Sequence, residues 1–157
     1  MEEEKFRRVM GHFSTGVTVV ASVTTTGEPV GLTVNAFTSV SLVPPLVLVC
    51  VHREAEPHGH LLEAGHFGVS ILNAEQADLA WTFSREDSAR RFHGLPDIRG
   101  RLGSPLVPGA LAWLECRIQE VYPGGDHSIV LGEVVDCEAK EGEPLLFFRG
   151  SLRSTRA

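Results

Sequence analysis

The stretch Gly31-Leu-Thr-Val-Asn-Ala-Phe-Thr-Ser-Val-Ser-Leu-Val-Pro-Pro-Leu-Val-Leu-Val-Cys-Val-His-Arg53 decides the fold of this chain. Its first half predicts a strand whose two faces alternate, one carrying Leu32, Val34 and Ala36 and the other Thr33, Asn35 and Phe37. Pro44 and Pro45 remove two ladder donors and fix the backbone, so they predict a corner. Residues 46–51 then predict a second strand, buried on both faces.

Polar side chains are unusually dense in this otherwise apolar stretch. Five hydroxyl or amide groups lie within nine residues: Thr33, Asn35, Thr38, Ser39 and Ser41. Such groups need hydrogen-bond partners when they are buried. Two interpretations stay open. The groups satisfy the strand edges and one another, or they line a pocket for a ligand rich in hydrogen-bonding edges.

Length, composition and charge limit the class of protein. The chain has 157 residues, a mass of 17.1 kDa and 43% hydrophobic residues, which indicates one folded domain over residues 1–157. No apolar run approaches the ~20 residues of a membrane helix, and the start Met1-Glu-Glu-Glu-Lys5 is acidic, so we expect a soluble cytoplasmic protein. The net charge of −6 argues against nucleic acid or an anionic membrane as partner.

The cysteines and histidines predict neither a disulfide framework nor a metal centre. Cys50, Cys116 and Cys137 are odd in number and lie in apolar strand patterns, so we expect reduced core residues. The spacing of the histidines fits no common zinc pattern, and solvated helix histidines are the default interpretation of His52, His58, His60 and His66.

The periodicity predicts two or three short helices. Residues 2–13 carry one apolar helical face, formed by Phe6, Val9, Met10 and Phe13. Pro57 and Gly65 mark the start and the end of a second helix. The capping-box pattern at residues 73–76 places the start of a third helix near Ala74, and helical spacing assigns Trp81 and Phe83 to a core or an interface.

Strands are predicted at residues 17–24, 66–72, 111–122, 127–137 and 145–148, in addition to those of the central stretch. In residues 111–122, Leu114, Cys116 and Ile118 share one face, and Glu115, Arg117 and Gln119 the other. Residues 94–109 lose periodicity and predict a surface loop, either a lid or interface arm or a disordered segment. About six strands with few helices favour a mainly β fold, a small closed barrel.

Residues 33–51 resemble the flavin-binding signature of the flavin reductase family, the small partner components of two-component flavin monooxygenases. The resemblance continues through residues 15–20, 65–72, 125–127 and 144–145. It implies a six-stranded FMN-binding split barrel with a Greek-key core, assembled as a homodimer. It also implies a flavin reductase that transfers a hydride from NADH or NADPH to FMN, or alternatively FAD, and supplies reduced flavin to a monooxygenase.

The chain has neither a Gly-x-Gly-x-x-Gly motif after a strand nor a P-loop, so the sequence does not support a Rossmann dinucleotide site or a P-loop. If a nicotinamide is used, it must dock on a flavin that the barrel already holds, which is what the resemblance implies. Such a reaction depends on positioning, and no obligatory catalytic side chain is expected. Two alternatives remain. One is a flavoredoxin-like FMN-binding electron-transfer protein that does not use nicotinamide. The other is a non-enzymatic barrel that has lost phosphate recognition.

The resemblance also assigns site residues by position. Four residues match the segment that lines the isoalloxazine and ribityl chain: Thr33, Val34, Asn35 and Ala36. Ser39 and Ser41 match a second polar pair, and the end of the following strand corresponds to Cys50, Val51 and Arg53. Arg53 could meet the flavin phosphate there, whereas plain core packing is favoured over a redox role for Cys50.

His127 follows Gly124-Gly-Asp126 and matches the family's Gly-Asp-His turn beside the nicotinamide. Taken without the resemblance, it could equally be a strand-start histidine bonded to the turn backbone. Asp126, His127 and Ser128 do not predict a catalytic triad, because adjacent residues on a strand point to opposite faces.

One departure concerns the phosphate. The family carries serine and threonine after this strand, where the chain has Glu54 and Glu56, and carboxylates repel a phosphate. Either these two side chains point away and an arginine supplies the charge, or flavin is held more weakly. The candidate arginines are Arg53, Arg85, Arg90 and Arg91.

Overall fold

The computed structural model describes residues 1–155. Its elements, in chain order, are α1 (Glu3–Met10), β1 (Thr15–Gly16), β2 (Thr18–Val23), β3 (Pro29–Val34), β4 (Phe37–Ser41), β5 (Leu46–His52), α2 (Glu56–Ala64), β6 (His66–Ile71), α3 (Ala77–Arg85), the 3-10 turn η1 (Ser88–Arg90), β7 (Ile98–Arg99), β8 (Pro105–Leu106), β9 (Ala112–Gly124), β10 (His127–Ala139), β11 (Leu145–Phe148) and β12 (Ser151–Ser154). The fold is therefore mainly β, as predicted.

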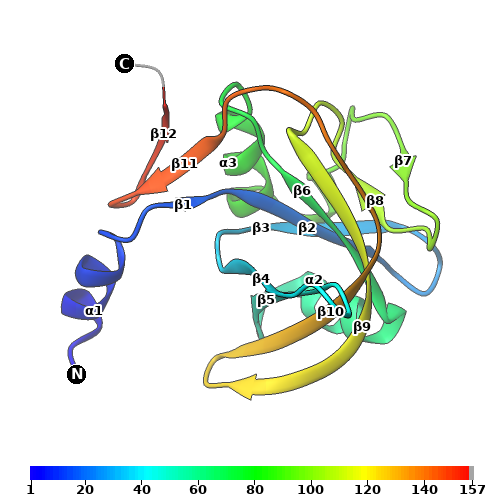
Figure 1. Cartoon of the computed structure of the whole chain (residues 1–157), viewed down its shortest axis with the longest axis horizontal. Coiled ribbons are helices and arrows are strands. Elements are labelled where there is room, and N and C mark those ends of the chain that lie inside the picture. Colours follow the sequence, from blue (N-terminus) through cyan, green and yellow to red (C-terminus); the bar gives the residue numbers. More distant parts are fainter. Residues whose placement is uncertain (156–157) are drawn as a thin grey trace.

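The main sheet has seven strands in the order β3-β2-β6-β9-β10-β5-β4, and every pair is antiparallel. The prediction of a closed six-stranded barrel was wrong in strand number and in closure, because the edge strands β3 and β4 do not pair with each other. Only Asn35 and Ala36 separate these two edges along the chain, so the sheet curls back on itself without closing (Figure 1).

The break at Asn35 and Ala36 divides one predicted strand into β3 and β4. The amide of Phe37 donates to the carbonyl of Asn35 at 2.9 Å, and the amide of Cys50 donates to the carbonyl of Ala36 at 3.0 Å. After the break Phe37 pairs with Val49 and packs against the core, which corrects its predicted position on the face opposite Leu32. The central stretch thus contains three strands where two were expected.

Strand β5 is buried on one face. Val47, Val49 and Val51 are buried, and the residues between them, from Leu46 to His52, are only half-buried. The expectation that both faces are buried was wrong, because no element of the described chain covers the outer face. That open face lies beside the break at Asn35 and Ala36.

The interior contains two apolar clusters, one inside the curled sheet and one beneath α3. Leu61 of α2 packs inside with Val49, Val51 and Phe67, and Ala80 and Phe83 of α3 pack on Val19 and Leu72. Helix α2 lies between Pro57, in its first turn, and Gly65, which ends it at φ +76°, as predicted. Helix α3 begins at Ala77, three residues after its predicted start.

The delay in α3 follows from the residues that suggested a capping box. The side chain of Asn73 accepts a hydrogen bond from the Glu75 amide at 2.8 Å, and Gln76 Oε1 accepts from the Asn73 amide at 3.0 Å. The Asn73 side chain therefore stabilises a local turn, and helix α3 starts only after this turn.

The segment 94–109 is more ordered and more buried than a surface loop. It contains β7 and β8 and lies on β6, where a Cβ added to Gly68 would come 2.6 Å from the carbonyl oxygen of Pro105. It also covers Glu115, which is fully buried and accepts a hydrogen bond from the Leu102 amide. Glu115 lies on the strand face opposite Cys116, as predicted, but this segment excludes its side chain from solvent.

The cysteine prediction is confirmed for one residue and fails for another. All three cysteines are free thiols, and Cys116 is buried. Cys50 is half-buried on the outer face of β5, whereas Cys137 is exposed near the end of β10. The end of that strand extends beyond the core, which explains the exposure.

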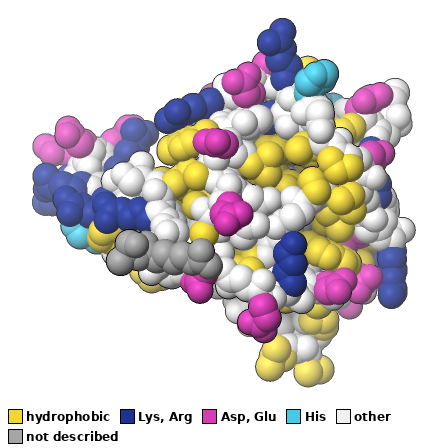
Figure 2. Space-filling view, turned by 90° about the horizontal axis from the view of Figure 1, so that it is seen from above, with side chains coloured by type: hydrophobic (Ala, Val, Ile, Leu, Met, Phe, Trp, Pro, Cys, Tyr) yellow, Lys and Arg dark blue, Asp and Glu magenta, His cyan; other side chains and the backbone are white. Residues whose placement is uncertain are grey.

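Helix α1 stands apart from the sheet, next to the small sheet formed by β1, β11 and β12 (Figure 1). None of its residues is buried, and its apolar face is open to solvent. Seen from above, the charged side chains of this helix gather at the left of the molecule, while hydrophobic patches lie over the body (Figure 2). No helix within residues 1–155 is long and apolar enough to cross a membrane.

Candidate functional site

The outer face of β5 and β10 forms an open surface next to the break between β3 and β4. The half-buried Cys50 and His52 point to this face, since the residues that alternate with them point to the core. Across the strands Cys50 pairs with Ile129 and His52 with His127. The Cys50 amide donates a hydrogen bond to the Ala36 carbonyl. His52 lies about 7 Å further along β5, a distance equal to the rise of two strand residues.

Two histidines and one aspartate converge at the end of this surface. His127 Nδ1 lies 2.7 Å from Asp126 Oδ1, and His52 Nε2 lies 4.0 Å from Asp126 Oδ2. The two imidazole rings meet edge to face, with centroids 5.1 Å apart. The hydrogen bond with His127 lowers the pKa of the Asp126 carboxyl, so this group is a carboxylate at neutral pH. Sequence reasoning selected His127 but missed His52, because the strand register that joins them was not predicted.

The opposite face of the same strands is occupied by helix α2. Ser128 is buried, and its hydroxyl lies 2.8 Å from His58 Nε2. Burial lowers the pKa of His58, and the nearby Arg53 and His52 lower it further. His127 and Ser128 therefore have different partners on different faces, in agreement with the expectation that Asp126, His127 and Ser128 form no triad. Within residues 1–155 no three His, Cys, Asp or Glu side chains converge as a metal site requires.

Two of the four candidate arginines, Arg85 and Arg91, already have side-chain partners. Arg91 donates to the carbonyl oxygens of Gly31 and Glu86 at 2.8 and 3.0 Å, and the guanidinium of Arg85 stacks 3.9 Å from the Trp81 ring centroid. Burial lowers the pKa of Arg91, and the nearby carboxyl of Glu56 opposes that shift. Arg53 is exposed, is anchored through its amide to the Asp126 carbonyl at 2.9 Å, and forms no ion pair among the described residues.

A cavity of about 200 Å³ lies between β3, α3 and the hairpin β11–β12. It is lined by Val17, Thr33, Asn35, Ala80, Trp81, Ser84, Phe147 and Leu152. The Thr33 hydroxyl already donates to the carbonyl of Ala80 at 2.6 Å, whereas Asn35 is exposed. Apolar walls with a few polar edges fit a planar heteroaromatic ring such as a flavin. Trp81 and Ser84 were missed as lining residues, although their spacing of three residues places them on one helix face.

Other predicted site residues can act only in limited ways. Val34 and Val51 are 6% and 0% exposed, so only their backbone groups could reach a ligand. Ser39 pairs with Val47 and Ser41 with Leu46, because the register of β4 shifts between them. Neighbouring residues of β5 point to opposite faces, so the two serines do as well.

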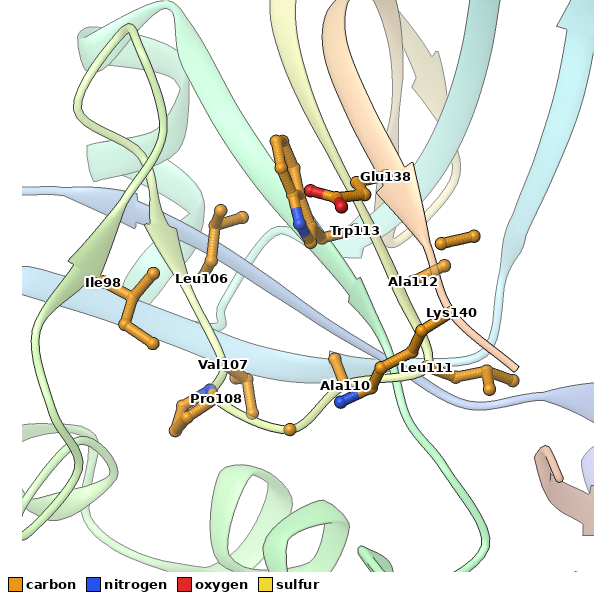
Figure 3. A pocket seen from close by; sticks show the side chains of 12 residues that line it. Ile98, Leu106, Val107, Pro108, Ala110, Leu111, Ala112, Trp113, Glu138 and Lys140 are labelled. Carbon is orange, nitrogen blue, oxygen red and sulfur yellow. The ribbon is translucent and has the colours of Figure 1, made fainter. Parts of the chain in front are cut away.

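A second cavity, of about 290 Å³, lies at the other end of the β9–β10 hairpin. Figure 3 shows Trp113 and Glu138 on one side of it, Lys140 and Leu111 on another, and Ile98 with Leu106 from the 98–106 segment facing them. Trp113 pairs with Glu138 at one end of the hairpin. Tyr122 pairs with Ile129 at the other end, near the turn next to His127. This cavity is therefore distinct from the surface that carries the predicted site residues.

A curled antiparallel sheet has an apolar cavity at one edge and, beside it, an open face that ends in two histidines and an aspartate. This arrangement defines a small ligand-binding β protein without a Rossmann or P-loop site. The chain belongs to the flavin reductase family, since the family model described as "Flavin reductase like domain" matches residues 10–156.

Similar proteins agree with this assignment. "FMN reductase (NADH) SmoA" of Agrobacterium fabrum is 42% identical over 147 residues, which cover 94% of this chain and 83% of that protein. The structure of BorF, the flavin reductase component of a bacterial two-component tryptophan halogenase, has 40% identity and a TM-score of 0.89, covering 98% of both chains. The NADH:FAD oxidoreductase SgcE6 of Streptomyces globisporus, in complex with NAD and FAD fragments, has 44% identity and a TM-score of 0.90, covering 97% of this chain and 92% of that one.

Proposed function

We propose that this protein is an NADH-dependent flavin reductase that transfers a hydride from reduced nicotinamide to FMN or FAD. The observation that supports this proposal is one continuous surface of the sheet. It runs from Asn35 and Ala36, past Cys50, to the pair formed by His127 and Asp126. A flavin ring bound from the first end and a nicotinamide bound from the second would stack face to face on this surface, as hydride transfer requires. NADH is preferred to NADPH here because SmoA and SgcE6 are named for NADH.

The residues present suggest how such a flavin would be held. Trp81 and Phe147 would cover the ring, and Asn35 and Ser84 would meet its polar edges. The backbone groups of residues 33–36 would contribute, with Val34 limited to its backbone. Bound flavin supplies the hydride acceptor, and the protein contributes orientation and exclusion of water.

The candidate arginines suggest how the phosphate end of the flavin would be bound. Arg53, at the end of β5, is exposed and has no ion pair among residues 1–155, so it would face the flavin phosphate. The Glu56 carboxylate lies near Arg91, which reduces its repulsion of a phosphate. Glu54 is exposed and forms no ion pair among residues 1–155, and we propose that it weakens flavin binding relative to a serine or threonine.

We further propose that the curled sheet is the family's split barrel and that residues 1–157 form one domain. The protein would act as a homodimer, because the apolar face of α1 has no cover within the described chain. It would supply reduced flavin to a flavin-dependent monooxygenase or a related oxygen-using partner, by analogy with BorF, which is the reductase component of a two-component halogenase.

An anaerobic titration tests this function. The purified protein is incubated with FMN or with FAD, and the flavin absorbance is followed as NADH or NADPH is added. Rapid bleaching by NADH supports a reductase and identifies its flavin. Bound flavin that stays oxidised with both nicotinamides would instead support an electron-transfer protein, and absence of flavin binding would overturn both.

A further inference from the structure

We propose that Asp126, supported by His52, holds His127 in the tautomer that carries its proton on Nδ1, so that Nε2 accepts a hydrogen bond from the carboxamide nitrogen of nicotinamide. The ligand class this selects is a pyridine nucleotide with a primary amide. The inference rests on the proposed function, because it places His127 beside the nicotinamide.

Asp126 determines which ring nitrogen of His127 carries the proton. His127 Nδ1 lies 2.7 Å from Asp126 Oδ1, a hydrogen-bond distance. An ionised carboxylate can only accept, so Nδ1 must donate. In the neutral imidazole the other nitrogen, Nε2, then carries a lone pair and no hydrogen. Neutral His127 therefore offers a ligand an acceptor.

His52 presents a second N–H group to Asp126. Its Nδ1 accepts a hydrogen bond from the Glu54 amide at 3.1 Å, so the neutral ring carries its proton on Nε2. That nitrogen faces Asp126 Oδ2 at 4.0 Å, a separation at which the attraction is electrostatic and not a hydrogen bond. Asp126 thus lies between two imidazole N–H groups. His52 acts through Asp126 as a positioning residue.

The backbone fixes the arrangement of His52, Asp126 and His127. His52 and His127 are direct partners in the β5–β10 ladder, and the Arg53 amide donates to the Asp126 carbonyl at 2.9 Å. The aspartate is held at both ends although its side chain is 77% exposed. A local geometry set by strand pairing can orient His127 before any ligand binds.

This arrangement should let the site discriminate between pyridine nucleotides that differ in the carboxamide group. A carboxamide has an N–H for the Nε2 lone pair, whereas a methyl ketone in its place has only an acceptor. Two acceptors facing each other leave both without a hydrogen bond. The site should therefore prefer the amide even when no hydride is transferred.

The test uses the oxidised dinucleotides, which bind without reacting. NAD⁺ and 3-acetylpyridine adenine dinucleotide are compared as competitive inhibitors of NADH oxidation by the flavin-loaded protein. We expect the wild type to bind NAD⁺ about tenfold more tightly, the value of one hydrogen bond. Asp126→Ala should reduce this preference to within about twofold, while Asp97→Ala, which changes another exposed aspartate, should leave it intact.

Two variants distinguish the contribution of the His52 N–H group from that of its ring. His52→Phe keeps a ring against His127 but loses the N–H, and should lower the preference by roughly threefold, as an exposed electrostatic contact would. His52→Gln keeps an N–H donor near the Nε2 position and should restore it. Equal behaviour of the two variants would overturn the role of His52.

Nitrogen NMR of the His127 ring tests the tautomer without any nicotinamide. The wild type should show a protonated Nδ1 and an unprotonated Nε2, and Asp126→Ala should lose that distinction. A protonated Nε2 in the neutral wild type, or equal binding of both dinucleotides by a protein that does reduce flavin, overturns the inference. A protein that reduces no flavin would instead overturn the proposed function, and the NMR result would still stand.

Discussion

The backbone of Gly132 in β10 lies directly against the ring of Phe67 in β6. A Cβ at residue 132 would come 2.7 Å from Phe67 Cζ and 2.9 Å from the Cβ of Cys116. At this contact the inner core of the curled sheet leaves no space for a side chain at residue 132.

We therefore expect Gly132→Ala to destabilise the protein by about 1–3 kcal/mol, because overpacking forces the ring or the strand to move. Urea unfolding measures the change. The matched control is Gly59→Ala in α2, where an added Cβ meets nothing within 4 Å and alanine should stabilise the helix by about 0.5–1 kcal/mol. A Gly132→Ala protein as stable as the wild type would contradict the packing described for Phe67.

The three thiols should differ in reactivity. Cys137 is exposed, whereas burial raises the pKa of Cys116 to about 12 and also raises the pKa of Cys50. Only a thiolate reacts rapidly, so a thiol reagent should modify Cys137 first, Cys50 slowly and Cys116 only after unfolding. Cys137→Ser should abolish the fast phase. A fast phase that survives this substitution would show that a second thiol is accessible.

Stability should fall as the pH is lowered below neutrality. Burial lowers the pKa of His66 from its ordinary 6.5, with the Glu115 carboxylate opposing, and burial also lowers the pKa of His58. A histidine whose pKa is depressed in the folded state takes up its proton first in the unfolded state. Stability is therefore complete above about pH 6.5 and decreases as the pH falls through that range.

Urea unfolding at pH 7.5 and 5.5 measures this effect in the wild type and in the double variant His58→Asn, His66→Asn. The variant should lose less stability between the two pH values, even if it is less stable at both. An unchanged pH dependence would show that other groups are responsible.

His127→Ala should separate the two ligands. Its ring lies at the end of the surface, beyond Cys50, whereas the flavin cavity is formed by other elements. We expect the KM for NADH to rise about tenfold, the loss of one hydrogen bond, with little change in the flavin Kd. Fluorescence titration gives the flavin Kd, and steady-state kinetics give the KM. Equal loss of both affinities would remove His127 from the nicotinamide side.

Local signals predicted much of the fold because neighbouring residues decide it. Pro57 and Gly65 enclose α2, and alternation predicted β9 with Cys116 facing the core. The break at Asn35 and Ala36 was not predictable in this way, because it depends on the hydrogen bond between Ala36 and Cys50, which lie fourteen residues apart in the printed sequence.

The candidate site shows the same division. The motif predicted His127 and the residues around Asn35, but His52 became its partner only through the register of β5 and β10. Trp81 was assigned to a core or interface by helical spacing, and only the packing of α3 on β3 places it at the cavity. Glu115 was predicted to lie on the strand face opposite Cys116, and its burial depends on a segment whose packing no local pattern encodes.

Helix α1 presents an apolar surface to solvent. Four apolar side chains lie on it or just after it and are exposed by 57%, 59%, 50% and 72%: Phe6, Val9, Met10 and Phe13. We expect a second copy of the chain to cover them, since each apolar side chain gains about 1.5–3 kcal/mol when it is fully buried. Sedimentation at micromolar concentration should therefore show a dimer.

Replacing both Phe6 and Phe13 by Asp should convert that dimer to a monomer, because each change removes an apolar contact and adds a charge that an interface must desolvate. The control is Glu3→Ala, which breaks only an exposed pair with Arg7 at 3.6 Å and should leave the dimer intact. A wild-type monomer, or a variant that still dimerises, would show that α1 does not form the dimer interface. Because Phe6 and Phe13 are exposed and no residue of α1 is buried, the monomeric variant should retain its fold by circular dichroism, which separates loss of assembly from unfolding.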